Sequence, residues 1–335
     1  MTSNEGDNGD SHPEKRRFSD PTSRESNERS FVPQDDMMAK IGIILPVAEG
    51  RMEGETPSWS DLLAMSQRAE ELGFDSVWVV DHLIVQSDTE PTAGVWECWS
   101  LLSALAAATS RVELGTLVLC NSFRNPALVA KMAETVDEIS NGRLILGLGA
   151  GHHEPEFRAF GFPFDHRASR FEEAIQIIAP LLRDGAVDFQ GRYYEAHNCE
   201  LRPRGPRPNG PPIVIGTSGK RMLDITARYA DGWNVYFDKT GNTVDGFRQI
   251  SHELDRACES IGRDPSTIER SVSVIVGVDG RTSVPGVAAP ILTGSPEDLA
   301  NEFRAYAEAG ADHIQVRVEP NTVSGVEDLA KVLGK

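Results

Sequence analysis

The prediction of the fold starts from residues 143–156, which read Arg-Leu-Ile-Leu-Gly-Leu-Gly-Ala-Gly-His-His-Glu-Pro-Glu. After the first arginine, the run to Gly149 is apolar and uncharged, as in a strand covered on both faces inside an α/β core. Gly147, Gly149 and Gly151 then allow the backbone to approach a neighbour or a ligand closely. Two imidazoles and two carboxylates follow. This order predicts chemistry at the carboxyl end of a strand, where open sheets and (β/α)8 barrels keep their sites.

Two other interpretations of this stretch are weaker. A dinucleotide-binding turn has the spacing G-x-G-x-x-G and opens directly into a helix, whereas here the spacing is G-x-G-x-G and Pro155 interrupts the exit. His152 and His153 are adjacent, so they would point in opposite directions from an extended backbone. No H-x-x-x-H or C-x-x-C pattern lies nearby. We therefore expect neither a dinucleotide-binding fold nor a metal site.

The composition is that of an ordinary globular protein. The chain has 335 residues, of which 39% are hydrophobic and 25% charged, and this length allows one domain of barrel size or two smaller ones. The formal net charge of -18 argues against a nucleic-acid-binding surface, because a phosphate backbone requires a basic face. The four cysteines are far apart and form no pattern, which favours free thiols in a reducing cytosol.

The ends of the chain and its hydropathy bear on location. No apolar run approaches the roughly 20 residues that a membrane span needs, and the amino terminus lacks the hydrophobic core of a secretory signal. We expect a cytoplasmic protein that does not bind membranes. Residues 1–36 are polar and nearly devoid of aliphatic side chains, so we interpret them as a disordered tail. Met37 and Met38 directly precede the first strand, and an over-long start-site assignment is the alternative explanation of the tail.

From residue 37 to the end, strand and helix patterns alternate. Strands are expected at residues 40–45, 76–80, 112–119, 143–149, 212–215, 232–236, 271–276 and 313–318. Helices are expected at residues 58–72, 96–108, 126–139, 169–182, 219–229, 243–261 and 295–309, with Ser295 and Asp298 as a capping pair. An insertion at about residues 184–211 follows the fourth of the barrel helices, and residues 188–194 within it predict a small hairpin over the barrel mouth. The pattern predicts a single (β/α)8 barrel.

Five motifs in register resemble a known family. They are Asp81-His82, Phe-Arg-Asn-Pro at 123–126, the run 140–151, Arg-Ala-Ser-Arg-Phe-Glu-Glu at 167–173 and Ala-Asp-Gly-Trp-Asn at 230–234. Together they resemble the luciferase-like monooxygenase superfamily, and most closely its coenzyme F420-dependent oxidoreductases. The resemblance covers residues 41–332. It implies a (β/α)8 barrel with a flavin or deazaflavin across the carboxyl-end mouth, and often a dimer, so a homodimer is expected.

Asp81 and His82 are the first catalytic candidates. An imidazole with a pKa near neutrality can take or give the proton that accompanies hydride transfer, and Asp81 could orient the chain around it. The resemblance places His82 beside the reactive face of the deazaflavin. The alternative is a histidine satisfied by backbone groups at a strand end.

Two positions depart from the F420-dependent sugar-phosphate dehydrogenases. Where those enzymes carry a glutamate acid after the strand-four glycines, this chain has His152, with Glu154 and Glu156 further along the loop. Where they carry a tryptophan shortly after the strand-two histidine, Gln86 stands here. We therefore include His152 among the catalytic candidates and regard a sugar-phosphate substrate as doubtful.

The resemblance also implies cofactor contacts. It predicts a bulge with a non-prolyl cis peptide bond near Leu117-Val118, behind the central ring. It places the cofactor phosphate between the exit at Gly149, Ala150 and Gly151 and the turn at Gly216, Thr217, Ser218 and Gly219 that leads into Lys220. Free amides, hydroxyls and positive charge at a helix start suit a phosphate, and an ordinary β/α turn with a solvated basic pair is the alternative. Arg167 and Arg170 could reach the same mouth or pair with Glu172 and Glu173 on their own helix.

The remaining candidates belong to a substrate pocket. Trp233 and Asn234 end the predicted sixth strand, where they could line the pocket, although a core tryptophan is equally consistent with the pattern. Trp96 is a further candidate for the wall.

The overall expectation is an oxidoreductase that moves a hydride to or from C5 of F420, with a small organic substrate that the sequence does not identify. The first alternative is an FMN-dependent monooxygenase that uses reduced flavin and O2, since both classes share the barrel and most motifs. The second is a non-catalytic flavin-binding barrel.

Overall fold

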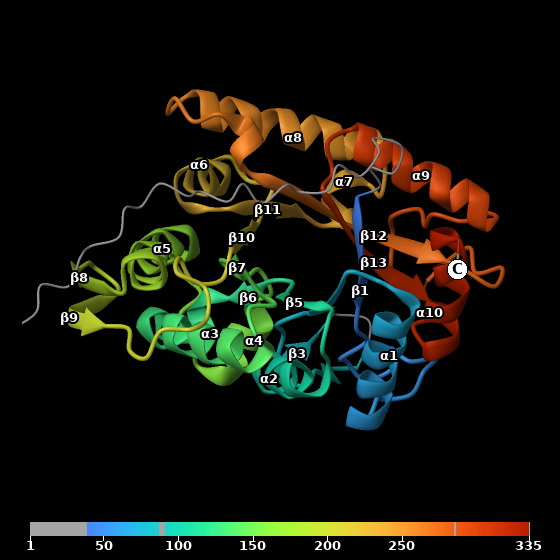
Figure 1. Cartoon of the computed structure of the whole chain (residues 1–335), viewed down its shortest axis with the longest axis horizontal. Coiled ribbons are helices and arrows are strands. Elements are labelled where there is room, and N and C mark those ends of the chain that lie inside the picture. Colours follow the sequence, from blue (N-terminus) through green and yellow to red (C-terminus); the bar gives the residue numbers. More distant parts are fainter. Residues whose placement is uncertain (1–38, 87–90, 285, 335) are drawn as a thin grey trace, which may run out of the picture. The chain divides into compact units, whose positions relative to one another are not determined.

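Eight parallel strands close into a barrel in the computed structural model, which describes residues 39–86, 91–284 and 286–334 (Figure 1). In barrel order they are β1 (Lys40–Ile44), β2 (Ser76–Val79), β5 (Glu113–Thr116), β7 (Leu144–Gly149), β10 (Ile213–Gly216), β11 (Gly232–Val235), β12 (Glu269–Gly277) and β13 (His313–Glu319). Two pairings close the ring, β13 with β1 and β10 with β7. The predicted (β/α)8 barrel is confirmed.

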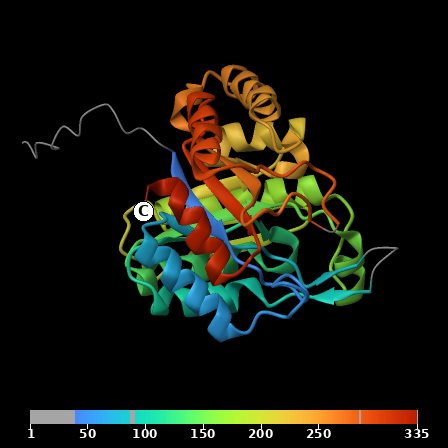
Figure 2. The same cartoon turned by 90° about the vertical axis from the view of Figure 1, so that its right-hand side faces the viewer.

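Helices follow the strands and cover the barrel. They are α1 (Trp59–Leu72), α2 (Cys98–Ala108), α3 (Pro126–Ser140), α5 (Arg167–Asp184), α6 (Lys220–Tyr229), α8 (Val244–Glu259), α9 (Pro296–Glu308) and α10 (Val323–Ala330). The predicted capping pair is present at α9, where the Ser295 and Asp298 side chains each accept the other's backbone amide. The blue α1 and the red α10 lie side by side in Figure 2, and an ion pair between Arg68 and Glu327 joins them. The first and last units of the barrel are thus joined outside the sheet as well as within it.

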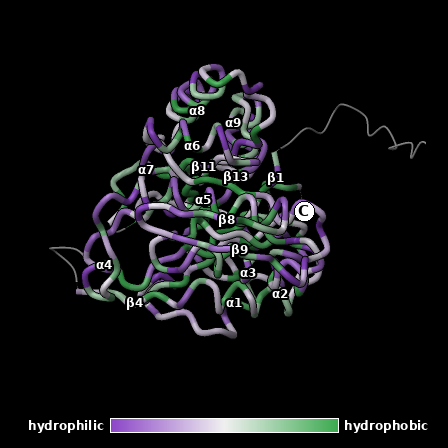
Figure 3. The backbone as a smooth tube through the Cα atoms, turned by 90° about the vertical axis from the view of Figure 1, so that its left-hand side faces the viewer, coloured by the Kyte–Doolittle hydropathy of each residue, from purple (hydrophilic) through white to green (hydrophobic). Residues whose placement is uncertain are grey.

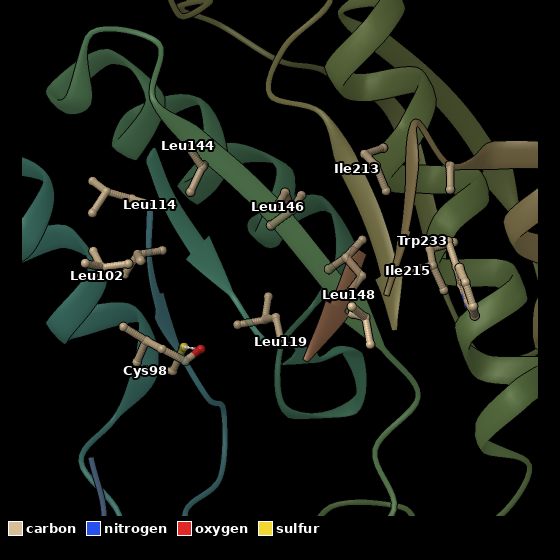
Figure 4. Packing of buried hydrophobic residues seen from close by; sticks show 14 of the residues in the cluster. Cys98, Leu102, Leu114, Leu119, Leu144, Leu146, Leu148, Ile213, Ile215 and Trp233 are labelled. Atoms are coloured by element: carbon tan, nitrogen blue, oxygen red, sulfur yellow. Dashed lines mark hydrogen bonds between the residues drawn. The ribbon is translucent and has the colours of Figure 1, made fainter. Parts of the chain in front are cut away.

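The core has two layers. The larger lies between strands and helices and includes Leu114, Leu146, Leu148 and Ile215, all fully buried (Figure 4). Figure 3 shows the same arrangement as hydrophobic strands inside a more hydrophilic shell. The smaller layer fills the barrel interior with Ile44, Trp78, Leu117, Ile145 and Val214. The barrel is therefore packed below its mouth, and ligands are restricted to the loop end.

Trp78 has room inside the barrel because two neighbouring strands carry glycine. A Cβ at Gly115 would lie 2.1 Å from the indole ring, and one at Gly42 would lie 2.7 Å from its Nε1. The indole nitrogen donates to Ser76 Oγ at 2.7 Å. The strand glycines of β1 and β5 are thus explained by packing.

The predicted hairpin forms, but the prediction of its position was wrong. Strands β8 (Ala186–Gln190) and β9 (Glu195–Glu200) pair antiparallel and lie against α5, on the outside of the barrel (Figure 3). Only the turn between them reaches the rim, where the Glu173 carboxylate accepts the amides of residues 192–194. The helix α5 packs on the barrel with one face, and the hairpin packs against α5 from outside.

The predicted strand at residues 112–119 is interrupted. Strand β5 ends at Thr116, and the chain continues as β6 (Leu119–Cys120), which pairs with β7. The peptide bond between Leu117 and Val118 is cis, as the resemblance predicts. A second short ladder, β3 (Ile84–Val85) with β4 (Ala93–Gly94), was not predicted.

Three further observations concern the whole chain. The predicted disordered tail, residues 1–36, lies outside the described residues. All four cysteines are free thiols, as predicted. Within the described ranges, none of the helices combines the length and the apolar character that crossing a bilayer requires.

Candidate functional site

The Asp81-His82 pair follows β2 at the carboxyl end of the barrel, and Glu156 meets it there. His82 Nδ1 lies 3.0 Å from Glu156 Oε1, and the Leu83 amide donates to Glu156 Oε2 at 2.9 Å. The Glu156 side chain is 2% exposed and that of His82 is 26% exposed. Burial works to raise the pKa of Glu156, but the His82 and Leu83 contacts outweigh it and hold this pKa below its usual value. A charged carboxylate therefore fixes one nitrogen of His82 and leaves Nε2 for a ligand.

Glu156 was missed as a site residue because of Pro155. The proline was interpreted as an interruption of the exit, whereas it occupies the first turn of a helix, α4 (Glu154–Phe160). Proline is favoured there, since its missing N–H is not needed in the first turn. The helix turns Glu156 inward, and the pattern of proline followed by an acidic residue in a first turn was the available signal.

Asp81 does not contact the His82 ring. Its Oδ2 accepts the Cys120 amide and Arg124 Nη1, each at 2.7 Å, and Arg124 also contacts Glu97. Burial opposes the charge of Arg124, but Asp81 and Glu97 outweigh it and raise the pKa of Arg124. Asp81 therefore links the loop after β2 to Cys120 and Arg124, and its role around His82 stays a prediction.

Two further histidines, His152 and His153, lie close to His82. Its ring centroid lies 5.4 Å from that of His152 and 6.3 Å from that of His153, both edge-on. His152 stands exposed on the rim, where partial desolvation and then the nearby His82 lower its pKa. His153 Nε2 accepts the Gln86 amide at 3.0 Å. At neutral pH the site thus holds one imidazole beside a carboxylate and a second, His152, that is kept uncharged.

Val118 forms a ridge on the floor of the mouth. A Cβ at Gly149 would lie 2.6 Å from Val118 Cγ2, and one at Gly216 would lie 2.9 Å from either Val118 methyl. The glycines of β7 and β10 therefore make room for Val118, which follows Leu117 and the cis bond. The predicted contact residues Leu117, Val118, Gly149 and Gly216 come together in one place.

The two glycine turns lie side by side because β7 and β10 are paired. Gly151 has a φ of +76°, and a Cβ there would lie 2.5 Å from Phe157 and 2.6 Å from Cys120 Sγ, so only glycine fits. Ala150 is half-buried between the two glycines of its turn. Beyond Gly216 and Thr217, the helix α6 begins after Gly219 with no side-chain cap and no acidic residue in its first turn.

The basic candidates divide into two groups. Lys220 extends along its own helix, where Nζ lies 2.9 Å from Asp224, so its contact with a ligand stays a prediction. For Ser218 too, the predicted contact with the cofactor phosphate stays a prediction. Arg167 donates to the Gly151 carbonyl at 3.2 Å and Arg170 to Asp165, and neither pairs with Glu172 or Glu173. Arg167 thus lies at the mouth, whereas Arg170 pairs with Asp165, and a contact of either arginine with a ligand stays a prediction.

Of the two alternatives for Trp233, the structure supports the core tryptophan, so its place in the substrate pocket was predicted wrongly. It is 0% exposed and stacks on Phe247 of α8 at 6.0 Å, on the helix side of β11, because the next residue takes the inward position of the strand. Its Nε1 donates to the Thr217 carbonyl at 2.8 Å, so it supports the turn that follows β10.

Asn234 faces the barrel interior and Trp96 the outer rim. Asn234 Nδ2 donates to Gln315 Oε1 at 2.9 Å within a buried polar network. Trp96 is 50% exposed, and its Nε1 donates to the Pro57 carbonyl at 2.8 Å. Their contact with a substrate remains a prediction.

The mouth, rather than a hollow at the other end of the barrel, is the candidate site. A hollow of about 430 Å³ lies at the opposite end of the barrel, beside Pro212 and Asp231 at the starts of β10 and β11. Barrel enzymes keep their chemistry at the other end. Nowhere in the described ranges do three His, Cys, Asp or Glu side chains converge as metal ligands would.

A sequence model of the luciferase-like monooxygenase family matches residues 38–284. The chain belongs to this family. It is 37% identical over 294 residues to the F420-dependent glucose-6-phosphate dehydrogenase of Amycolatopsis mediterranei (strain U-32), covering 76% of this chain and 87% of that one. It is 32% identical over 249 residues to the pyrimidine monooxygenase RutA of Escherichia coli (strain K12), covering 69% and 63%. Both relatives are oxidoreductases, and this luciferase-like protein is an enzyme of the same family.

Solved structures support the fold independently. An F420-dependent secondary alcohol dehydrogenase in complex with an F420-acetone adduct superimposes with a TM-score of 0.75 at 21% identity, covering 88% of this chain and 98% of that one. This similarity confirms the barrel fold. At 21% identity it carries no information on the activity.

Proposed function

We propose that this luciferase-like protein is an F420-dependent oxidoreductase that transfers a hydride between C5 of the deazaflavin and a small organic substrate. The observation that carries the proposal is the His82–Glu156 couple at the carboxyl end of the barrel, the end at which Val118 and the two glycine turns also lie. The 37% identity to an F420-dependent dehydrogenase supports F420 as the cofactor.

The residues at the mouth fit such a cofactor. Gly149 and Gly216 make room for Val118, so a flat ring system would rest on the half-buried Val118 side chain rather than on the backbone at these glycines. The uncapped start of α6 after Gly219 suits a phosphate, because free amides and the helix dipole attract negative charge. Bound F420 would supply the two-electron chemistry as a hydride donor or acceptor.

His82 would handle the proton. With Nδ1 held by Glu156, Nε2 can accept a proton from a substrate hydroxyl as a hydride leaves the substrate carbon, or return it in the reverse direction. The charged carboxylate of Glu156 would stabilise the imidazolium and hold its orientation. His152, uncharged at neutral pH, could hydrogen-bond to the substrate without repelling that charge.

A binding experiment tests the proposal. Purified protein is titrated with F420 and with FMN, each oxidised and reduced. Binding of F420 together with turnover of F420 by a panel of alcohols and ketones is the expected result. His82→Ala should retain F420 binding and lose turnover, because it removes the proton acceptor alone. Exclusive binding of FMN would overturn the choice of cofactor.

The second candidate is an FMN-dependent monooxygenase, and the 32% identity to pyrimidine monooxygenase RutA favours it. Oxygen consumption that depends on reduced FMN and a substrate would support this function. Absence of turnover with any acceptor would instead favour a barrel that only binds flavin.

We also propose that the protein is a cytoplasmic homodimer. The four free thiols suit a reducing compartment, and dimers are common in the family that the motifs resemble. Sedimentation equilibrium at several protein concentrations tests the oligomeric state, and fractionation of cells tests the location.

A further inference from the structure

We infer that Arg167, Arg170 and Arg192 form a binding site for carboxylate groups that a ligand carries beyond its phosphate, and we name them the rim arginine cluster. This inference rests on the proposed function, because the ligand is the γ-glutamyl tail of F420. FMN ends at its phosphate, whereas F420 continues through a lactyl group into glutamates with free carboxylates. The site would therefore contribute to the choice between the two cofactors.

Arg167 connects the cluster to the phosphate-binding turns. It is the first residue of α5, it is half-buried, and its Nη1 donates to the Gly151 carbonyl at 3.2 Å. Its guanidinium lies 3.8 Å from the centroid of the Phe164 ring, which holds it against the rim. The part of a ligand that continues beyond a phosphate bound at the Gly151 and Gly216–Gly219 turns would therefore contact Arg167 first.

Arg170 and Arg192 continue the cluster away from the turns. Their guanidinium carbons lie 4.4 and 5.3 Å from the centroid of the Tyr193 ring. The Arg170 side chain is 16% exposed. Tyr193 stands at the tip of the β8–β9 hairpin, which Glu173 holds through the amides of residues 192–194. The hairpin thus brings a third arginine to the rim.

The cluster carries an excess of positive charge. Among the described residues, Asp165 is the one carboxylate that pairs with the cluster, through Arg170, and Asp165 is itself 61% exposed. Glu173 is occupied by backbone amides, and Glu172 pairs with Arg221 of α6. In the part of the chain that the structure describes, neither Arg167 nor Arg192 has a carboxylate within ion-pair distance. Such an excess stands out in a chain with a net charge of -18.

The chemistry of the cluster favours carboxylates. Guanidinium groups bind them through two parallel hydrogen bonds, and the rings of Phe164 and Tyr193 orient these groups before a ligand arrives. Little rotational freedom of the arginines is then lost on binding. The cluster spans only three side chains, which suits a short tail better than an extended polyanion.

The experiment measures Kd for F420 with its glutamates and for the deazaflavin that ends at the phosphate, by quenching of deazaflavin fluorescence. The expected result is that the wild-type protein binds the tailed cofactor roughly tenfold more tightly, with a preference that shrinks as salt rises. Arg167→Ala should reduce the preference to about twofold or less. It should weaken binding of the tail-less compound by a smaller factor than binding of the tailed cofactor, because Arg167 also holds the Gly151 carbonyl. Arg167→Lys should keep part of the preference. Arg183→Ala is the matched control, because Arg183 lies at the other end of α5 and pairs with Asp231.

The outcomes separate this inference from the proposed function. Equal affinity of the wild-type protein for both compounds would overturn the tail site and leave the proposed function intact. An unchanged preference in both Arg167→Ala and Arg170→Ala would also overturn it. Failure to bind either deazaflavin would overturn the proposed function itself. Circular dichroism of each variant confirms that the barrel has folded.

Discussion

At His82 one ring nitrogen is available to a substrate, because Glu156 occupies the other. We predict that Glu156→Gln lowers kcat roughly 10- to 100-fold. A neutral amide would not stabilise an imidazolium, and its NH2 group could donate to Nδ1 and favour the neutral tautomer that carries its proton on Nε2. Cofactor affinity should change little, because Glu156 is placed against His82 and Leu83 rather than against the glycine turns. Steady-state kinetics over a range of pH, together with a cofactor titration, measure both quantities.

Two further variants make this prediction specific. Glu156→Asp should restore part of kcat, since it returns the charge at a slightly greater distance. Glu154→Gln is the control, because Glu154 lies on the same helical turn but is exposed. A wild-type kcat in Glu156→Gln would show that this carboxylate only supports the loop at Leu83.

Val118 provides a second test at the residue scale. In Gly149→Ala the new methyl group would lie 2.6 Å from Val118 Cγ2, so the ridge must move. We predict a loss of about 1–3 kcal/mol in the free energy of unfolding, the usual cost of overpacking. Gly219→Ala, where no heavy atom lies within 4 Å of the new Cβ and φ is negative, should change it by about 0.5 kcal/mol or less. Urea unfolding measures both values, and equal losses would refute the packing explanation.

Among the elements, α1 is joined to the loop that leads into β5 by one carboxylate. Glu70 accepts the backbone amides of Ser110, Arg111 and Val112 and the Ser110 hydroxyl. Partial burial works to raise its pKa, but these hydrogen bonds outweigh it and lower the pKa of Glu70 to about 2, from 4.5.

The pH dependence of stability follows from this lowered pKa. A carboxyl group whose pKa is lower in the folded state contributes its full stability above the unfolded value, and this contribution falls as the pH drops from 4.5 toward 2. Because solvent screens Glu70, we expect about 1–2 kcal/mol rather than the full linkage value. Glu70→Gln should lose this amount at neutral pH and show a smaller difference from wild type near pH 3. Urea unfolding of both proteins at the two pH values tests it, and a difference that does not depend on pH would contradict it.

The elements also show which features a sequence pattern can predict. The eight barrel strands were predicted because each is a short apolar run between turn signals, and the capping pair at Ser295 because its spacing is local. The inward turn of α4 was missed because Pro155 fits both a loop and a first helical turn. The position of the hairpin was wrong because nothing local specifies which surface an insertion covers. The contact of His82 with Glu156 joins residues 74 positions apart, which periodicity does not encode.

At the scale of the whole molecule, Trp233 illustrates the same limit. An aromatic residue at a strand end suits a pocket or the helix layer, and the choice depends on the phase of the strand in the closed barrel. The gathering of His82, the Gly147–Gly151 run and the Gly216–Gly219 turn at one end could be predicted, since parallel strands in a barrel share their carboxyl ends.

That shared end gives a prediction for the molecule as a unit. A cofactor that contacts the loops after β2, β5, β7 and β10 binds only when the barrel is closed, so it stabilises the folded state by mass action. F420 at about 100 times its Kd should raise the free energy of unfolding by about 2.7 kcal/mol. For a domain of this size the midpoint of thermal unfolding should rise by roughly 4 °C. FMN at the same concentration should raise it less, because it offers the rim arginine cluster no carboxylate. Thermal unfolding followed by circular dichroism measures both shifts, and a larger shift with FMN would favour the monooxygenase function over the one proposed.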